Sequence, residues 1–321
     1  MPLLFYRGSV GSVTDREEIP SQNDLQTPEP SPPVFNESSS GTDADMLFTA
    51  IIGSDPTEVS MADYLPGVVA GEMPASFEPD SLMAQAVAAR TYILYRMGHA
   101  CENHPDCDVC GDSACCKAYL DEHALREKWG DNYDINMKKI TDACTNTDGQ
   151  YLCFDGEPIQ ATFHSSSAGV TEDSANIWKA APYLVSVDSP EDADDVPNYI
   201  TTVEVSPGDF ASTVCDIFPS ADLSGDPSDW LGDMIRNGSG RVDAVTLGNT
   251  AVSGTALRDL FELRSTAFTL EYTGFSFLFT VTGYGHGVGM SQYGANVMAS
   301  RGVAWQEILE HYYPGTYISS Y

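Results

Sequence analysis

The spacing of hydrophobic residues along the chain alternates between helical and strand patterns. The longest helical pattern covers EPDSLMAQAVAARTYILYRMGH, residues 78–99, in which Leu82, Ala86, Ala89 and Ile93 form one apolar stripe. The alanines in this stripe predict close packing against another element. This segment is therefore expected to be a central helix of the folded chain.

Other segments carry the alternation that is typical of strands. We expect strands in residues 46–53, 241–248 and 271–285, and a β-rich region over residues 128–161. Helices are expected in residues 254–264 and in two C-terminal segments that Arg301-Gly302 separates. Pro66 and Gly67 should limit the helix before them to one short turn, residues 61–64. The predicted class is α+β, with mixed helices and antiparallel strands in two lobes around a cleft.

The first 45 residues have a different composition. TPEPSPPVFNESSSGTDAD and its surroundings are rich in Ser, Pro, Thr, Asp and Glu, and cannot bury enough apolar surface to fold. We expect residues 1–45 to be a flexible linker or tail, and residues 46–321 to form the folded domain. No apolar run is long enough to span a bilayer, and the first ten residues do not resemble a signal peptide. Two alternatives stay open: a tether whose membrane anchor has been removed, or a soluble protein with a disordered tail.

The charge of the chain excludes one class of partner. With 47 acidic and 15 basic residues among 321, the formal net charge is −32. Binding to nucleic acid requires clustered Lys and Arg against the phosphates, so nucleic acid is not an expected partner. A neutral or mixed-charge ligand, such as a sugar polymer, is compatible with this charge.

Three blocks of sequence together resemble a known family. They are VVAGEMPASFEPDSLMAQAVAARTY, FHSSSAGVTEDSANIW, and GYGHGVGMSQYGANVMASRG followed by ILEHYYPGT. In order and spacing they resemble the stage II sporulation protein D family, which also includes the amidase enhancers. The resemblance extends from about residue 62 to the C-terminus. It implies a lytic transglycosylase, which cuts peptidoglycan glycan strands and leaves 1,6-anhydro-muramic ends.

Glu72 is the expected catalytic residue, because it matches the catalytic glutamate of that family. Its small and apolar neighbours in VVAGEMP predict a partly desolvated carboxyl with a raised pKa, suited to protonating a glycosidic oxygen. Spacing alone leaves two other roles open, as a cap for the helix near Pro79 or as the partner of an arginine. One carboxyl is enough for this reaction, since the 6-hydroxyl of N-acetylmuramic acid can attack its own anomeric carbon.

The other candidate site residues are expected to bind substrate, and each has a structural alternative. Arg90 is a candidate to orient Glu72 or hold a sugar carbonyl, or else to form a surface ion pair. The HSSS segment has no nucleophile elbow around it, so His164 and Ser167 are sugar-binding candidates or members of a locally bonded turn. The substrate-binding set expected from the resemblance is Gln85, Arg90, His164, Ser167, His286, Gln292 and Tyr293.

The glycine-rich segment GYGHGVGMSQYG lacks the spacing of a nucleotide-binding loop. Its glycines allow backbone amides to approach a ligand closely, and Ser291 is placed to cap the following helix. His286 can then contact a sugar, or else be a buried residue that forms hydrogen bonds within a tight turn.

A cysteine-rich excursion, residues 99–119, contains five of the eight cysteines. Thiolates with imidazole suit tetrahedral zinc, while an even number of cysteines outside the cytoplasm also suits disulfides. Some family members bind zinc with a spacing that His104, Cys110, Cys115 and Cys116 match, with Cys115 where a histidine is common. We expect one structural zinc on these four residues, and Cys107 is an alternative ligand.

The function expected from the sequence is therefore peptidoglycan cleavage between N-acetylmuramic acid and N-acetylglucosamine, on peptide-stripped strands during sporulation engulfment. The resemblance implies an extracytoplasmic location, at the bacterial cell surface or in the forespore intermembrane space. It also implies a cell-wall amidase and membrane partners of the engulfment machinery, while the tether-like tail suggests a membrane anchor in the full-length protein. A non-catalytic, peptidoglycan-binding amidase enhancer is the alternative. A zinc hydrolase is disfavoured, because the cysteine-rich ligand set leaves no open position and no H-E-x-x-H is present.

Overall fold

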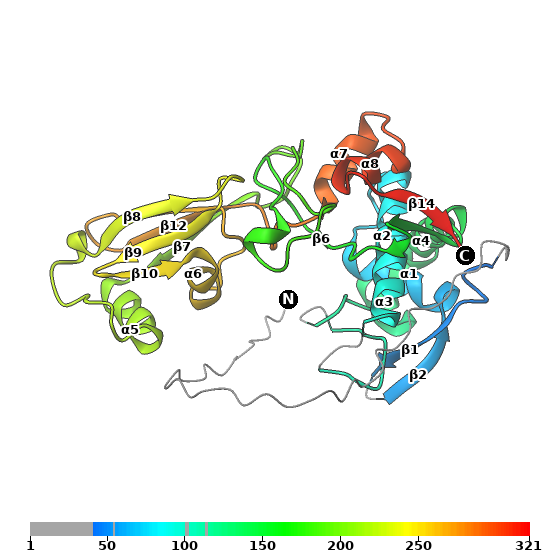
Figure 1. Ribbon diagram of the computed structural model, residues 1–321, viewed down its shortest axis with the longest axis horizontal. Helices are drawn as coiled ribbons and strands as arrows, with labels where there is room; N and C mark the ends of the chain where they lie inside the picture. Colours follow the sequence, from blue (N-terminus) through cyan, green and yellow to red (C-terminus); the bar gives the residue numbers. More distant parts are fainter. Residues whose placement is uncertain (1–40, 54, 100–102, 113–114) are drawn as a thin grey trace, which may run out of the picture.

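The computed structural model describes residues 41–53, 55–99, 103–112 and 115–321. The expected flexible tail falls mostly outside the described residues, but residues 41–45 belong to the fold, since Asp43 is buried. Two lobes lie side by side along the long axis of the molecule (Figure 1), each with its own hydrophobic core. The α+β class with antiparallel sheets is confirmed.

The first lobe is built around α2 (Pro79–Met97), which contacts helices on several sides. Its alanines let neighbouring helices pack closely, and nearly every residue from Ser81 to Leu94 is buried. The prediction of a central helix is confirmed. The other helices of this lobe are α1 (Met61–Glu72), α3 (Glu122–Trp129), α4 (Tyr133–Asn146), α7 (Gln292–Ser300) and α8 (Trp305–Tyr312), with the short 3-10 turn η1 (Gly130–Asn132).

The strands of the first lobe form small sheets around these helices. The predicted strand at residues 46–53 is confirmed as β1, which pairs antiparallel with β2 and parallel with β3. A second sheet has the order β14-β4-β5. The strands are β1 (Leu47–Ile52), β2 (Asp55–Ser60), β3 (Val109–Cys110), β4 (Gln150–Phe154), β5 (Glu157–Pro158), β6 (Phe163–His164), β13 (Met290–Ser291) and β14 (Tyr317–Ser320).

The prediction of a single helical turn over residues 61–64 is wrong, because α1 continues through Pro66 to Glu72. Proline in a helix interior removes one backbone hydrogen bond. Here tertiary packing offsets that loss, since α1 is buried from Tyr64 to Ala70. A Cβ atom on Gly67 would lie 2.5 Å from the Tyr119 ring, so the glycine lets the segment at residues 118–120 pack directly against the helix.

The β-rich region expected over residues 128–161 is also partly wrong. Helices α3 and α4 occupy most of residues 122–146, and strands begin only with β4. Ile140, Ala143 and Cys144 are the buried positions of α4, and this helical spacing is easily missed in a polar segment.

The second lobe, residues 200–282, has its own core. A cluster of stacked aromatic rings centres on Phe210, whose ring lies 4.1 Å from that of Phe277. Its sheets have the orders β11-β12-β7 and β10-β9-β8, and neighbouring strands are antiparallel. Its elements are β7 (Ile200–Val205), α5 (Pro207–Ile217), η3 (Pro227–Asp229), β8 (Leu231–Arg236), β9 (Val242–Leu247), β10 (Thr250–Ser253), α6 (Gly254–Leu260), β11 (Phe268–Tyr272) and β12 (Phe277–Thr282).

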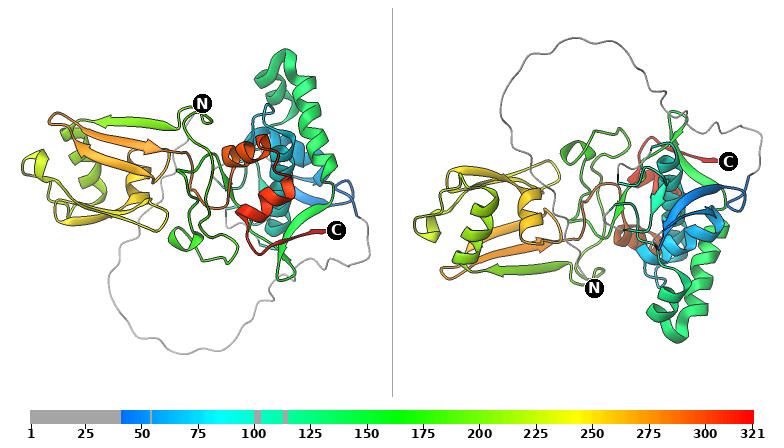
Figure 2. Two further views of the ribbon diagram at one scale, coloured as in Figure 1. Left: turned by 90° about the horizontal axis from the view of Figure 1, so that it is seen from above. Right: turned by 90° about the horizontal axis from the view of Figure 1, so that it is seen from below.

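Two stretches of chain join the lobes, as the views in Figure 2 show. One is the long irregular segment from β6 to β7, which contains η2 (Ser174–Asn176), and the other is the glycine-rich segment between β12 and β13. Parallel pairing of β13 with β6 brings the two stretches together. None of the helices in the described parts of the chain has the length and apolar character needed to cross a membrane.

Candidate active site

Glu72 is the last residue of α1, where the helix meets the last residues of the cysteine-rich excursion. This segment lies close to the helix because a Cβ atom on Gly71 would be 2.9 Å from the carbonyl oxygen of Ala118. The backbone N–H of Ala118 donates a hydrogen bond to Oε1 of Glu72, at 2.9 Å. The carboxyl is only partly buried. Glu72 is therefore held by one oxygen and does not cap α2, whose N-cap is Glu78.

Lys117 is a positively charged residue near Glu72. Its Nζ lies 3.7 Å from the centre of the Phe163 ring, in β6, and 4.8 Å from that of Tyr92. Burial lowers the pKa of Lys117, and the negative charge of Glu72 acts in the opposite direction. The ammonium group of Lys117 thus packs against aromatic rings of α2 and β6, near enough to Glu72 to interact with it electrostatically.

His164 lies at the end of β6 and is buried. Its Nε2 is 2.7 Å from Oγ of Ser167, and its Nδ1 is 3.3 Å from the carbonyl oxygen of Val288. Burial lowers the pKa of His164 well below its usual value, and the nearby His286 and Arg241 add to this effect. Ser167 is fully buried as well. The two side chains form a hydrogen bond with each other. This is the kind of local hydroxyl bond expected in the alternative to sugar binding, a locally bonded turn.

His286 lies on the glycine-rich segment, with its ring centre 5.7 Å from that of His164. The backbone N–H of Val288 donates to Nδ1 of His286 at 3.0 Å, so the other ring nitrogen carries the proton in the neutral form. Burial lowers the pKa of His286 to about 3, with a contribution from the charge on Lys117. The imidazole is therefore a neutral hydrogen-bond donor near neutral pH.

Glycine is required in this segment by close backbone packing. Gly289 has a φ of +74°, and a Cβ atom there would lie 2.0 Å from the carbonyl oxygen of Thr162. The segment consequently lies directly against the chain that leads into β6, which brings His286 beside His164.

The start of α7 follows immediately after β13. The prediction that Ser291 caps this helix is confirmed, because its Oγ accepts a hydrogen bond from the N–H of Gly294 at 3.2 Å. Gln292 is buried, and within the described residues its Nε2 has no hydrogen-bond partner. The partly buried ring of Tyr293 packs edge-on against Phe77, with ring centres 5.0 Å apart.

Two buried carboxylates, which the sequence did not predict as site residues, support this arrangement. Glu191 accepts hydrogen bonds from the N–H of Ser167 at 2.6 Å and from Oγ of Ser291 at 2.5 Å. It therefore ties the serine that contacts His164 to the cap of α7. Glu172 is the second, and its oxygens accept from donors of the segment that joins the lobes and of the second lobe. Neither is distinguishable in the sequence, which contains 47 acidic residues.

Gln85 and Arg90 are on α2 and are fully buried. Arg90 does not have the expected substrate-binding geometry, because Asp43 accepts from its Nε at 2.7 Å and from its second amino group at 2.6 Å. The carbonyl oxygen of Gln150 accepts a further bond at 2.9 Å. Arg90 forms an ion pair, but the pair is buried, whereas the alternative expected it at the surface. Gln85 has no hydrogen-bond partner for either side-chain polar atom among the described residues, and no exposed surface to offer a substrate.

The described part of the cysteine-rich excursion brings three expected metal ligands together. One ligand atom each from His104, Cys110 and Cys115 lie within 4.8 Å of one another. The fourth expected ligand, Cys116, lies outside that group, but its Sγ is 3.9 Å from Sγ of Cys115. The thiols of Cys110 and Cys116 are free, which does not favour a disulfide between them.

These distances fit a zinc ion. Two sulfurs on one tetrahedral zinc, with Zn–S bonds of about 2.3 Å, lie about 3.8 Å apart. Burial raises the pKa of the thiols of Cys110 and Cys116, so a cation would be needed to hold them as thiolates. Cys107, the alternative ligand, is not part of this group of three ligand atoms, and its Sγ donates to the carbonyl oxygen of His104 at 3.7 Å.

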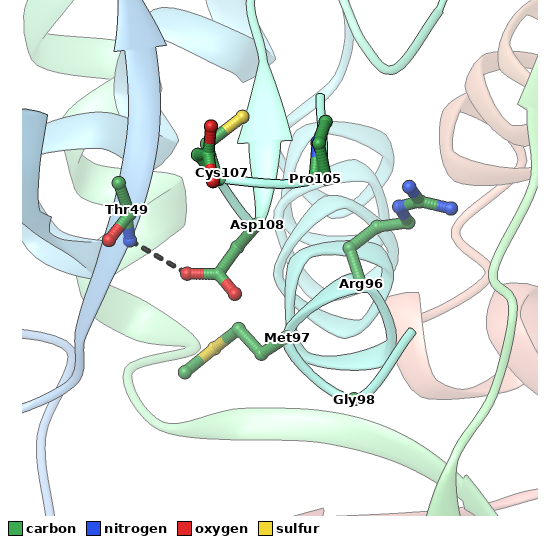
Figure 3. Close-up of a pocket in the computed structure, with 8 residues that line it drawn as sticks. Thr49, Arg96, Met97, Gly98, Pro105, Cys107 and Asp108 are labelled. Carbon is green, nitrogen blue, oxygen red and sulfur yellow. Dashed lines mark hydrogen bonds between the residues drawn. The ribbon is translucent and has the colours of Figure 1, made fainter. Parts of the chain in front are cut away.

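A separate pocket lies between β1 and the end of α2, and Figure 3 shows the residues that line it. In it, a carboxylate oxygen of Asp108 accepts a hydrogen bond from the N–H of Thr49 at 2.7 Å. Together with the pairing of β1 and β3, this bond fastens the cysteine-rich excursion to the first lobe. Glu72 does not line this pocket.

Comparison with known proteins decides the family. Residues 55–154 match the family described as Stage II sporulation protein, SpoIID. Stage II sporulation protein D of Bacillus subtilis (strain 168) is 36% identical over 264 residues, which cover 81% of this chain and 75% of that protein. The chain belongs to the stage II sporulation protein D family. The family member from Bacillus amyloliquefaciens is 37% identical over 264 residues, covering 81% of this chain and 74% of the other.

A second kind of relative is more distant. The amidase enhancer of Bacillus subtilis (strain 168) is 27% identical over 310 residues, which cover 80% of this chain and 40% of that protein. The relatives of this stage II sporulation protein D family member therefore include both a stage II sporulation protein D and an amidase enhancer.

Proposed function

We propose that this protein is a peptidoglycan lytic transglycosylase, and that Glu72 is its catalytic acid and base. One observation carries the proposal. The partly exposed carboxyl of Glu72 is held at the end of α1 by the N–H of Ala118, and the adjacent Lys117 interacts electrostatically with Glu72 as well as with His164 and His286. The bond cleaved would join N-acetylmuramic acid to N-acetylglucosamine.

The surrounding carboxylates favour a mechanism with one acidic residue. Glu172 and Glu191 are buried, and hydrogen bonds from protein donors occupy both oxygens of each. They are thus poorly placed to act as the second carboxylate that an ordinary glycosidase requires. Glu72 would protonate the leaving oxygen and then accept the proton of the 6-hydroxyl, which closes the 1,6-anhydro ring without an external nucleophile.

His286 and Tyr293 are the candidates for substrate contact among the expected residues, because both are partly exposed. The neutral imidazole of His286 would donate a hydrogen bond to a hydroxyl or acetamide oxygen of the sugar. His164 and Ser167 are buried and would not contact the substrate. They would instead hold the glycine-rich segment in place, through the hydrogen bond between His164 and the carbonyl oxygen of Val288. Gln292, buried with an unpaired amide nitrogen in the described structure, would complete this supporting layer.

We further propose that His104, Cys110, Cys115 and Cys116 hold one structural zinc. Bound zinc would supply the folding energy that this polar segment lacks. The segment matters for Glu72 because Ala118, whose N–H holds the carboxyl, is two residues after Cys116.

The names of the relatives support a role at the cell wall in sporulation. We propose that the protein acts outside the cytoplasm on peptide-stripped glycan strands, together with a cell-wall amidase and membrane partners. The amidase enhancer among the relatives favours one second candidate, a peptidoglycan-binding module without catalysis.

Replacing Glu72 with Gln separates the two candidates. The amide keeps the shape of the side chain and can still accept from Ala118, but it cannot transfer the catalytic proton. Proton transfer by a placed side chain contributes a factor of about 10²–10⁴ to the rate. The rate at which anhydro-muramic products are released from peptide-free strands should therefore fall by at least this factor. Glu58→Gln, at an exposed position of β2, is the matched control and should cleave like the wild type.

Mass spectrometry of the released sugars, with strand binding measured in parallel, gives the result. Cleavage by Glu72→Gln within a few-fold of wild type would show that Glu72 is not the acid. Wild-type protein that binds strands without releasing products would support the binding module.

A further inference from the structure

Trp178 lies beside the candidate active site with an exposed indole. Its ring centre is 5.0 Å from that of His286, and 47% of its surface is accessible. Trp230 and Trp305, in contrast, are buried in the cores of the two lobes. A single exposed aromatic residue needs no special explanation, so its surroundings decide whether it has a role.

The backbone around Trp178 is firmly held. Its N–H donates to the carbonyl oxygen of Ser174 at 2.7 Å, which closes the turn that contains η2. Oγ of Ser174 accepts from the N–H of Ala181 at 2.9 Å, just after Trp178 in the chain. Hydrogen bonds therefore fix the chain on both sides of the exposed ring.

Glu172 anchors the same turn to the second lobe. Its Oε1 accepts from the N–H of Asp173 and from Nδ2 of Asn176, both at 2.8 Å. Its Oε2 accepts from Nδ2 of Asn237 at 2.7 Å and from Oγ of Ser239 at 2.9 Å, and these two residues belong to the turn after β8. A fully buried carboxylate with this many donors leaves the turn little freedom.

We propose that Trp178 is a stacking platform for a pyranose ring of the glycan strand, in a subsite next to His286. This inference rests on the proposed function for its substrate class. The faces of a pyranose carry C–H groups, which pack on a flat aromatic ring, while the neighbouring imidazole can donate to a hydroxyl. A stacking contact needs no positive charge, which suits a protein with a net charge of −32. Because the turn is held in place before binding, little ordering cost reduces the affinity.

Binding of peptide-free glycan strands tests the platform. The measurement uses the full chain in the Glu72→Gln background, so that the strands are not consumed. Trp178→Ala should weaken binding at least about tenfold, as expected for a buried aromatic contact, and Trp178→Phe should weaken it less. Phe275→Ala is the matched control, because Phe275 is 89% exposed at the far turn between β11 and β12, and it should bind like the parent.

Tryptophan fluorescence provides a second readout that does not depend on the alanine variant folding. Titration with strands should change the emission of the parent protein, and the change should be much smaller in Trp178→Phe. Trp178→Ala that is folded and binds within twofold of the parent would overturn the inference, as would an unchanged fluorescence response in Trp178→Phe. Strand binding that depends on Trp178 in a wild-type protein that releases no products would uphold the platform and reject the transglycosylase.

Discussion

Removing the carboxylate of Asp43 should destabilise the first lobe more than any surface substitution. Asp43 binds the Arg90 guanidinium through two hydrogen bonds of 2.7 and 2.6 Å, and the side chains are 7% and 0% accessible respectively. It also accepts from the N–H of Gly149 at 3.2 Å and from the hydroxyl of Tyr321. Asp43→Ala would leave a buried guanidinium without its counter-ion.

The magnitude follows from that unpaired charge. Breaking a buried ion pair by removing one partner costs about 3–5 kcal/mol. Arg90 keeps its hydrogen bonds to the carbonyl oxygens of Gln150 and Cys144, which places the expected loss near the lower end, at about 3 kcal/mol. In a domain of this size, each kcal/mol lowers Tm by about 2–4 °C, so a decrease of about 6–12 °C is expected.

Denaturant unfolding followed by circular dichroism would measure this loss. Asp45→Ala is the control, because Asp45 is an exposed acid two residues away and its removal changes the net charge equally. It should remain close to wild type. If Asp43→Ala unfolds at the same denaturant concentration as Asp45→Ala, the buried pair does not stabilise the fold and the reasoning fails.

Two further predictions concern the metal and the histidines. Purified protein should contain one zinc by elemental analysis, and Cys110→Ser should lose it while Cys215→Ser, in α5 of the second lobe, should not; metal-free wild type would contradict this. The pKa of His286 in the folded protein is about 3, below its usual value of 6.5, so the unfolded state binds a proton first as the pH falls. The contribution of His286 to the free energy of unfolding should therefore be fully present above about pH 6.5 and decrease as the pH falls towards 3. Between pH 7 and 4, the free energy of unfolding measured in denaturant titrations should decrease less for His286→Gln than for wild type. Equal decreases would contradict the lowered pKa of His286.

The sequence predicted the elements whose pattern is strong and local. The stripe of α2 and the Ser291 cap of α7 could be predicted because helical spacing and N-capping act within a few residues. The continuation of α1 through Pro66 could not, because it depends on burial against residues about 50 positions later in the chain.

The same distinction applies to the candidate site. Three of the four predicted zinc ligands lie together because they come from one short segment. Arg90, in contrast, was predicted to contact substrate, and only the fold reveals that Asp43 is its partner. Glu172 and Glu191 carry no local signal, since their donors come from residues up to 100 positions away.

The arrangement of the lobes has a consequence for the order of folding. The core of the second lobe uses only residues 210–281, so this lobe can form from one continuous stretch of chain. The first lobe instead closes by joining Asp43 to Tyr321, a separation of 278 residues. Loop closure of that length is an entropic cost that local contacts do not offset, so the first lobe should be the slower to form. In refolding from denaturant, the backbone amides of the elements that carry the aromatic cluster around Phe210 should therefore become protected from hydrogen exchange before the backbone amides of α2.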